Sequence, residues 1–400
     1  MLQVQEKASA NAGDFETLIA GVRKVAAETK ARAGEIDTTR KFPVDLFDEI
    51  ESTGAFRMLS PKEYGGLELT LANMNEVVFE AARGNGSLGW LMMVGTAQSI
   101  GNGLFPEETV RSINRDFPDV RIRGVIAPKG QAVPVEGGYM ISGQWPFASG
   151  GPNPDFVAGN CIIMEGGKPK MSPEGDPEMV LAMVPAPQAE FLDTWYVLGM
   201  RGTDSCDVAI RDVFVPSAMT YNLHDIKTCY DTPASRLPLR VALSLPHCAV
   251  ALGLAQGALD DLIELCKTKR SSMNPKMLLG DDVVFRHELG KQVVRLEGSK
   301  GMLDSVTANV WKAGEDHRAL TPKEVLVSRL AANFITGECA EIVNWAYTVV
   351  GSSSVYDGSS LQRRLRDIHI ATQHASCHAD PYRNLGAAML GVELTPRELF

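Results

Sequence analysis

Apolar side chains recur at three- and four-residue steps through the first hundred residues, which is the period of an amphipathic helix. The pattern is clear from Phe15 to Val25 and continues to about Ala97. The segment Pro61-Lys62-Glu63-Tyr64-Gly65-Gly66 interrupts it, because proline and glycine favour a turn, and a further helix is predicted over Leu71–Arg83. We therefore expect an all-helical first domain over residues 1–119.

The pattern changes between Val120 and Pro216, where short β-type runs are separated by Gly, Pro and Asp. Gly137-Gly138 lies between two of these runs, and both glycines can take a positive φ, so a β-hairpin is predicted there. Residues 120–225 are expected to form a small antiparallel β-barrel or sandwich. The predicted strands are Ala132–Glu136, Tyr139–Ser142, Phe156–Met164, Met179–Val184 and Val208–Val215.

The helical period returns after Pro238 and persists through four long segments with few breakers. These segments predict an antiparallel four-helix bundle over residues 226–400. They are Val241–Lys267, Asp281–Ala313, Pro322–Val350 and Leu361–His378. The predicted fold class is therefore α+β, mainly α, with a helical domain, a β domain and a helical bundle in that order.

Composition limits the classes of function. A chain of 400 residues with 44% hydrophobic content exceeds one ordinary core. The net charge of −10 and the lack of a Lys/Arg-rich run argue against nucleic acid and anionic membranes as partners. No export signal or membrane-spanning stretch is visible, and the seven cysteines show no CxxC spacing, so we expect a soluble cytoplasmic protein.

The segment Gly84-Asn85-Gly86-Ser87-Leu88-Gly89 fits the letters of the GxGxxG dinucleotide fingerprint. A predicted helix precedes it, however, where such a site requires a strand. We interpret the segment as a glycine-rich break between two helices. The chain then has no recognisable nicotinamide site, and any reduced cofactor must come from another protein.

Several local sequences, together with the order of the three parts, resemble the acyl-CoA dehydrogenase superfamily. Phe42-Pro43 and the Pro61–Gly66 turn resemble its early helix and turn. Gly199-Met200-Arg201-Gly202-Thr203-Asp204-Ser205-Cys206 resembles the end of its β domain, and Leu361-Gln362-Arg363-Arg364-Leu365-Arg366-Asp367 resembles its closing helices. The resemblance implies that fold, a flavin cofactor and a homotetramer.

Within this superfamily, Trp145-Pro146-Phe147-Ala148-Ser149-Gly150 resembles the W-x-F-x-S-G loop of the oxygenase components of two-component flavin-dependent monooxygenases. The resemblance implies that Trp145 and Phe147 flank the isoalloxazine ring and that Ser149 bonds near N5. A hydroxyl against N5 in an apolar pocket opposes the collapse of a C4a-(hydro)peroxyflavin to H2O2. The implied cofactor is FMNH2 or FADH2 with O2 as co-substrate, and the implied partner is a separate NAD(P)H:flavin reductase.

The glutamate that the dehydrogenases of this superfamily use for proton abstraction is missing. Counting onward from Asp367 places one known position at or beside Ala375, yet no carboxylate occurs from residue 368 to 379. The other known position lies on an earlier helix, and residues 237–259 contain neither Asp nor Glu. The absence indicates oxygen chemistry rather than dehydrogenation.

His374 lies next to the vacated position. An imidazole with a pKa of about 6.5 can accept a phenolic or indolic proton and so activate the ring toward an electrophilic peroxide. We predict that His374 is the catalytic base, with stabilisation of the flavin peroxide as an alternative role. His369 and His378 are weaker candidates, although helical spacing would place His374 and His378 on one face.

The resemblance assigns further residues to the site. Trp90 is expected in the substrate pocket, and Arg201 and Thr203 are expected near the flavin edge or the substrate. His247, on the first helix of the predicted bundle, is a further candidate for the pocket. A glycine turn is expected at the flavin phosphate through its backbone amides and hydroxyls, whereas Arg366 and Asp367 are expected to form a structural ion pair. The turn residues are Gly351, Ser352 and Ser354. No metal site is expected, because no second ligand type accompanies the histidines at a familiar spacing.

The predicted function is hydroxylation of a small aromatic or heteroaromatic compound. Three alternatives stay open at this point. An enzyme of the same fold could oxygenate nitrogen or sulfur, an acyl-CoA dehydrogenase could have a relocated base, or the chain could bind flavin without catalysis.

Overall fold

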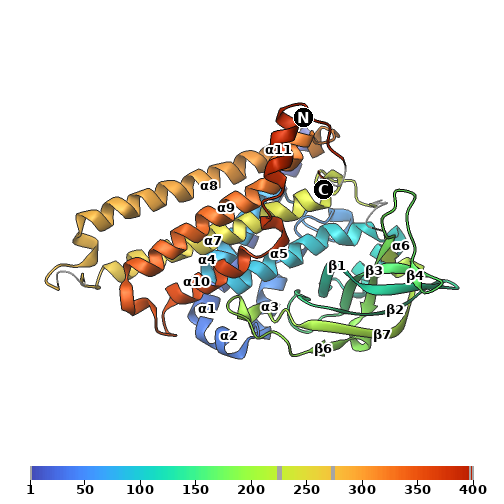
Figure 1. Ribbon diagram of the computed structural model, residues 1–400, viewed down its shortest axis with the longest axis horizontal. Coiled ribbons are helices and arrows are strands. Elements are labelled where there is room, and N and C mark those ends of the chain that lie inside the picture. The colour runs from blue at the N-terminus through green and yellow to red at the C-terminus, as the bar shows by residue number, and fades with distance from the viewer. Residues whose placement is uncertain (1, 223–227, 272–274, 396–397, 399–400) are drawn as a thin grey trace.

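The computed structural model describes residues 2–222, 228–271, 275–395 and 398, and combines a helical N-terminal part, a twisted sheet and a long helical bundle (Figure 1). The N-terminal helices are α1 (Leu2–Ala31), α2 (Ala33–Thr39), α3 (Val44–Ser52), α4 (Leu71–Gly84), α5 (Gly86–Gly101) and α6 (Glu107–Asp116). Side chains cap the starts of two of them: Thr70 and Asn73 form a capping box on α4, and the Asn85 side chain accepts from two amides of α5. The predicted helical first part is therefore present.

The middle of the chain forms a sheet with the strand order β6-β7-β2-β1-β3-β5-β8, and β4 pairs with β3. The strands are β1 (Ile122–Val135), β2 (Gly138–Trp145), β3 (Phe156–Glu165), β4 (Lys168–Pro169), β5 (Met179–Pro185), β6 (Glu190–Leu192), β7 (Asp207–Pro216) and β8 (Thr220–Tyr221). β1 and β3 pair in parallel, so the sheet is mixed rather than purely antiparallel. β1 also begins ten residues before the predicted strand.

The predicted hairpin joins β1 to β2, but its two glycines act differently. Gly137 has a φ of +78°, which a turn requires and glycine tolerates. Gly138 is already paired in β2, where a Cβ atom would lie 2.1 Å from the Val215 carbonyl oxygen of β7. The second glycine therefore permits close strand approach.

The C-terminal half contains the predicted bundle, made of α7 (Leu239–Cys266), α8 (Val283–Glu315), α9 (Pro322–Val349) and α10 (Ser360–Ala371), followed by α11 (Pro381–Met389). α7 is long and apolar enough to cross a membrane, yet 89% of its apolar window is buried, because it lies at the centre of the bundle. α10 ends at Ala371 rather than at the predicted His378. The segment that carries His374 is therefore not helical.

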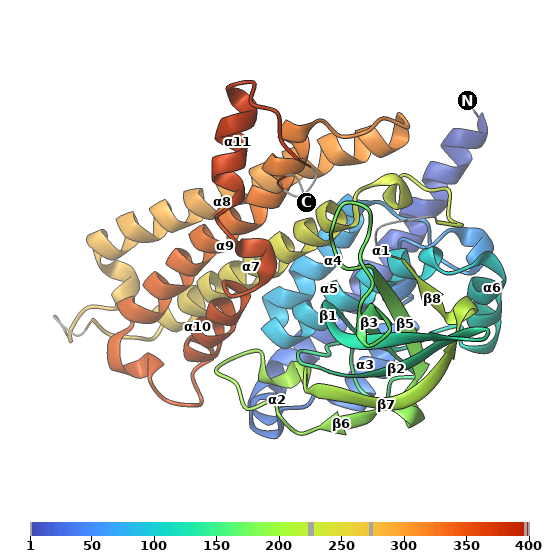
Figure 2. The ribbon, with the colours of Figure 1, turned by 45° about the vertical axis from the view of Figure 1, so that its right-hand side comes forward.

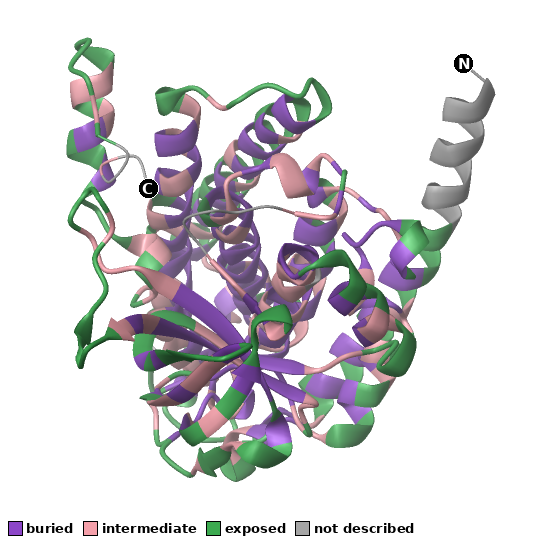
Figure 3. Cartoon of the chain, turned by 90° about the vertical axis from the view of Figure 1, so that its right-hand side faces the viewer, coloured by how far each residue is buried: buried purple, intermediate pink, exposed green. Residues whose placement is uncertain are grey.

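One hydrophobic cluster runs without interruption from the N-terminal helices into the bundle. It includes Val22 of α1, Met74 of α4, Leu254 of α7 and Ile335 of α9. A second cluster, which contains Trp145, fills the interior of the sheet, and exposed residues lie on the loops and on the outward sides of the strands and helices (Figure 3). Helix α5 lies between α7 and the sheet, so loops of the sheet meet the bundle along it (Figure 2).

Candidate active site

Three aromatic side chains from distant segments meet beside α5. Trp90 is on α5, His247 is on α7, and His374 follows α10. The ring centroid of Trp90 lies 5.3 Å from that of His374 and 5.9 Å from that of His247, both edge to face. The two imidazoles stack with centroids 5.0 Å apart and planes 18° from parallel. All three residues predicted for the substrate pocket are therefore neighbours.

Trp90 lies on α5, which follows α4 directly, and both helices pack very closely on their neighbours. α4 ends at Gly84 and α5 begins at Gly86, which confirms that the GxGxxG-like segment is a break between helices. A Cβ atom at Gly84 would lie 2.6 Å from the Ala26 carbonyl oxygen, and one at Gly89 would lie 2.4 Å from the Ala82 Cβ. These glycines serve helix packing and leave no strand for a dinucleotide site.

A chain of buried hydroxyl groups begins at Trp90. The indole Nε1 donates to Ser149 Oγ at 3.2 Å, and Ser149 Oγ lies 2.6 Å from Ser205 Oγ. Ser205 donates to Thr203 Oγ1 at 2.8 Å, and Thr203 donates to the Met200 carbonyl at 2.9 Å. Ser149 and Thr203 were predicted from sequence, whereas Ser205 was missed although it belongs to the same motif as Thr203.

The loop that carries Thr203 and Ser205 has an unusual backbone. Met200 and Asp204 both adopt positive φ, at 50° and 45°, which is strained for residues other than glycine. The Asp367 carboxylate accepts the Met200 amide at 2.5 Å at one end of this loop. Arg123 donates to the Asp204 carbonyl and carboxylate, both at 2.9 Å, at the other end. Arg123 was missed because sequence patterns place no strand around it.

The predicted flavin-facing pair divides between the inside and the outside of the sheet. Trp145 is 1% exposed within the sheet core, and its indole N–H donates to the Asn160 carbonyl at 2.8 Å. It cannot flank a ligand from there, which corrects the prediction: strand alternation turns its side chain inward. Phe147 has a φ of +64° and is 66% exposed, beside Trp195 at 5.9 Å between centroids. An aromatic surface is available at Phe147.

Both imidazoles are held neutral. Burial, with a smaller contribution from His374, lowers the pKa of His247 to about 3, and burial also lowers the pKa of His374. No carboxylate contributes to either shift among the described residues. The Ser376 amide donates to His374 Nδ1 at 3.3 Å, so the neutral ring carries its hydrogen on Nε2. This tautomer donates from Nε2, in contrast to the predicted proton abstraction.

The other two histidines differ from the sequence interpretation. His374 caps a 3₁₀ turn with ψ at 148°, so helical spacing does not place it on one face with His378, which is exposed. His369 lies 3.0 Å from the Asn344 side-chain oxygen. Neither has a ring contact with the Trp90 cluster among the described residues.

The glycine turn is not part of this cluster within one chain. Gly351 and Ser352 are exposed, but Ser354 is buried and donates to the carbonyls of Tyr347 and Gly351, so its hydroxyl is not free for a phosphate. The turn precedes the 12-residue α10, which is about 18 Å long, and His374 follows the opposite end of that helix.

The predicted pair of Arg366 and Asp367 is also different. Arg366 forms a bidentate pair with Asp37 at 3.0 and 2.8 Å, while Asp367 accepts the Met200 amide. Adjacent residues on α10 point in different directions, so the two side chains bind separate segments. Both are structural, but they do not pair with each other.

The available groups fit a reduced flavin. Ser149 is a hydrogen-bond acceptor at the edge of the cluster, Phe147 offers an exposed ring, and the buried Arg201 Nε has no partner. An electron-rich tricycle with an N–H group is complementary to an aromatic surface, an acceptor and a cation. In the part of the chain that the structure describes, no group of three His, Cys, Asp or Glu could hold a metal ion.

Comparison with known proteins agrees with this geometry. Residues 14–104 match the acyl-CoA dehydrogenase N-terminal domain, and residues 245–379 match the acyl-CoA dehydrogenase C-terminal domain. The chain belongs to the acyl-CoA dehydrogenase superfamily. Its relatives include an indole-3-acetate monooxygenase and an oxygenase subunit of a flavin-dependent monooxygenase, so the superfamily and the monooxygenase branch expected from sequence are both confirmed.

Three relatives illustrate this part of the superfamily. The indole-3-acetate monooxygenase of Pseudomonas putida is 29% identical over 96% of this chain and 94% of its own. The oxygenase subunit HsaA of a flavin-dependent monooxygenase from Rhodococcus jostii is 24% identical over 92% of this chain and 96% of its own. The structure of XiaF from a Streptomyces species, in complex with FADH2 and glycerol, superposes with a TM-score of 0.86 at 23% identity, over 99% of this chain and all of XiaF.

Proposed function

We propose that this protein is the oxygenase component of a two-component flavin-dependent monooxygenase that hydroxylates a small aromatic or heteroaromatic compound. A separate NAD(P)H:flavin reductase would supply it with FMNH2 or FADH2. The observation that carries the proposal is the meeting of the buried Ser149 with the half-buried Trp90 and His374 in one cluster, in which no described carboxylate contacts the rings. The relatives are oxygenases of this kind, which supports the same conclusion.

A bound reduced flavin would supply the two electrons that activate O2, so that one oxygen atom of O2 enters the substrate and the other leaves as water. The residues of this chain would control where that happens. Ser149 would accept a hydrogen bond from the flavin, and the exposed Phe147 would offer its ring an aromatic surface. Trp90 joins this half of the site to the substrate half, because its N–H bonds Ser149 and its ring edge contacts His374.

His374 has a revised role in this proposal. Because its Nδ1 accepts the Ser376 amide, its Nε2–H can donate a hydrogen bond to an oxygen of the substrate or of the oxidant. His247, with no exposed surface, packs flat against His374 and fixes the plane of its ring. A neutral cluster of one indole and two imidazoles offers aromatic surface that suits a flat aromatic substrate.

The alternatives differ in how well this geometry supports them. Nitrogen or sulfur oxygenation would use the same residues, and product analysis separates it from hydroxylation. An acyl-CoA dehydrogenase would need a carboxylate at the rings, and the nearby acids are engaged elsewhere: Asp367 with the Met200 amide and Asp204 with Arg123.

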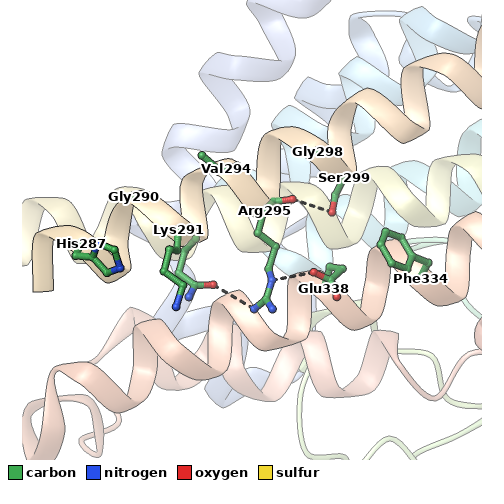
Figure 4. A pocket seen from close by; sticks show the side chains of 10 residues that line it. His287, Gly290, Lys291, Val294, Arg295, Gly298, Ser299, Phe334 and Glu338 are labelled. Carbon is green, nitrogen blue, oxygen red and sulfur yellow. Dashed lines mark hydrogen bonds and ion pairs between the residues drawn. The ribbon is translucent and has the colours of Figure 1, made fainter. Parts of the chain in front are cut away.

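We also propose the homotetramer that the superfamily resemblance implies. The outer surface of α8 and α9 exposes apolar side chains that a soluble monomer usually covers, among them Val294 at 72% and Phe334 at 45% exposure. They line a groove of about 810 Å³, which Arg295 crosses to reach Glu338 at 2.8 Å (Figure 4). A second copy of the chain is the proposed occupant.

The deciding experiment supplies the protein with chemically reduced FMN or FAD, ¹⁸O2 and a panel of aromatic acids, phenols and indoles. We expect a product that contains one ¹⁸O atom, detected by mass spectrometry, and no product when oxidised flavin replaces the reduced form. Failure to produce any oxygenated compound, combined with flavin reduction by an acyl-CoA without O2, would establish the dehydrogenase alternative instead.

Variants of His374 test its role in the same assay. His374→Gln retains an N–H donor but no base of useful pKa, whereas His374→Ala retains neither. If His374 acts as a donor, the Gln variant should keep much more product formation than the Ala variant, which we expect to lose roughly tenfold or more. Equal loss in both variants would restore the role of base.

A further inference from the structure

The hydroxyl chain next to Trp90 has only one possible direction. The Met200 carbonyl can only accept, so the hydrogen of Thr203 points to it at 2.9 Å. Thr203 therefore accepts from Ser205 at 2.8 Å, and Ser205, with its single hydrogen engaged, must accept from Ser149 at 2.6 Å. The hydrogen of Ser149 is thus directed to Ser205 and is not available to another partner.

The remaining hydrogen-bonding capacity of Ser149 is also determined by its neighbours. A serine oxygen has two acceptor positions, and the Trp90 indole N–H occupies one of them at 3.2 Å. Ser149, Ser205 and Thr203 are 6%, 2% and 1% exposed, so bulk water offers them no alternative partners. The one position left on Ser149 can accept a hydrogen bond but cannot donate one.

We propose that Ser205 and Thr203 are positioning residues that hold Ser149 as a pure acceptor, so that the site selects a flavin whose N5 carries hydrogen. This inference rests on the proposed function. Reduced flavin has an N5–H donor, which this acceptor binds. Oxidised flavin has a bare lone pair at N5, which the Ser149 lone pair repels. The site would then retain reduced flavin and release the oxidised form after turnover.

The loop anchors support this arrangement. The carbonyl that terminates the chain belongs to Met200, whose strained backbone Asp367 holds through the amide. Arg123 holds Asp204, the residue between Thr203 and Ser205, by two hydrogen bonds. The hydroxyls therefore have a rigid frame, which is what a fixed hydrogen-bond direction requires.

The test compares the dissociation constants of oxidised and anaerobically reduced FMN or FAD for wild type and Ser205→Ala. Removing the Ser205 hydroxyl frees the Ser149 hydrogen, which can then donate to oxidised N5. We expect oxidised flavin to bind the variant more tightly, on the order of tenfold, and the preference for reduced flavin to fall. Structural damage to the site would instead weaken the binding of both oxidised and reduced flavin.

Two further variants and a control complete the test. Thr203→Val should act in the same direction as Ser205→Ala, because it frees the Ser205 hydrogen to turn toward Ser149, whereas Thr203→Ser should resemble wild type. Ser142→Ala removes a hydroxyl that bonds Asp212, outside the hydroxyl chain. This control should not change the ratio of the dissociation constants for oxidised and reduced flavin. An unchanged ratio in Ser205→Ala contradicts the inference even when wild type oxygenates its substrate. Wild type that binds neither flavin form contradicts the proposed function itself.

Discussion

At the scale of single residues, the site combines strained backbone with buried polar groups that are held from several sides. Met200, Asp204 and Phe147 are non-glycine residues at positive φ around the hydroxyl chain. Such conformations cost on the order of 1–3 kcal/mol each and persist only where neighbours enforce them. Arg123 and Asp367 are those neighbours. We infer that the fold gives up stability here to orient Ser149.

His247 gives the residue-scale prediction, which concerns pH. Its pKa is lowered to about 3 in the folded chain, against about 6.5 when unfolded, so below pH 6.5 the unfolded state binds the proton first. As the pH is lowered below about 6.5, the free energy of unfolding should therefore decrease, by about 1.4 kcal/mol per pH unit from this group. In His247→Gln that contribution should vanish, as measured by urea unfolding between about pH 6 and 4.5.

Other titrating groups make a matched comparison necessary. His374 acts in the same direction as His247, since burial lowers its pKa. Asp367 acts in the opposite direction, because burial raises its pKa to about 6 and the folded state takes up that proton first. The difference between wild type and His247→Gln isolates His247, and the exposed His287→Gln serves as control. If the free energy of unfolding depends on pH in the same way in wild type and in His247→Gln, the lowered pKa does not belong to His247.

At the scale of elements, α5 connects the two halves of the site. It begins at a side-chain cap, packs on α4 and α7 through glycine contacts, and carries Trp90 between the sheet loop and the histidines. α10 ends early, which releases His374 from the helix and lets its ring accept the Ser376 amide. The packing of α5 therefore positions Trp90, whereas the early end of α10 positions His374.

The cap of α5 can be tested directly. Asn85 accepts from the amides of Ser87 and Leu88, and Asn85→Ala leaves both without that partner. We expect a loss of about 1 kcal/mol in the free energy of unfolding, measured by chemical denaturation. Asn85→Asp, which keeps the accepting oxygen at a helix N-terminus, should retain most of the stability. If Asn85→Asp loses more stability than Asn85→Ala, the stabilisation by Asn85 does not come from its hydrogen bonds to the helix amides.

At the scale of the whole molecule, the N-terminal helices and the C-terminal bundle share one core, with Met74 and Leu254 in the same cluster. The sheet packs against this helical body with a core of its own. The domain limits proposed from sequence, near residues 119 and 225, therefore separate secondary-structure types rather than three independent cores. The apolar outer surface of α8 and α9 is left for a second copy of the chain.

The assembly proposal predicts the effect of a charge on that surface. Val294→Glu places a carboxylate in the groove between α8 and α9, where burial against another copy would be costly. We expect the variant to dissociate to a smaller species, measured by sedimentation or light scattering. Val133→Glu, at an exposed valine of β1 in the sheet, is the matched control and should keep the wild-type mass. A Val294→Glu protein of unchanged mass would place the interface elsewhere.

The sequence by itself determined the order of helices, sheet and bundle, because periodicity and turn residues are local properties that survive without tertiary contacts. It also determined Ser149, Trp90, His247 and His374 as candidates through resemblance to a known superfamily. Only the tertiary structure decided that Trp145 is buried, that Ser205 and Arg123 belong to the site, and which nitrogen of His374 carries hydrogen. These depend on strand orientation, on where helices end and on hydrogen bonds between distant segments, which no local pattern specifies.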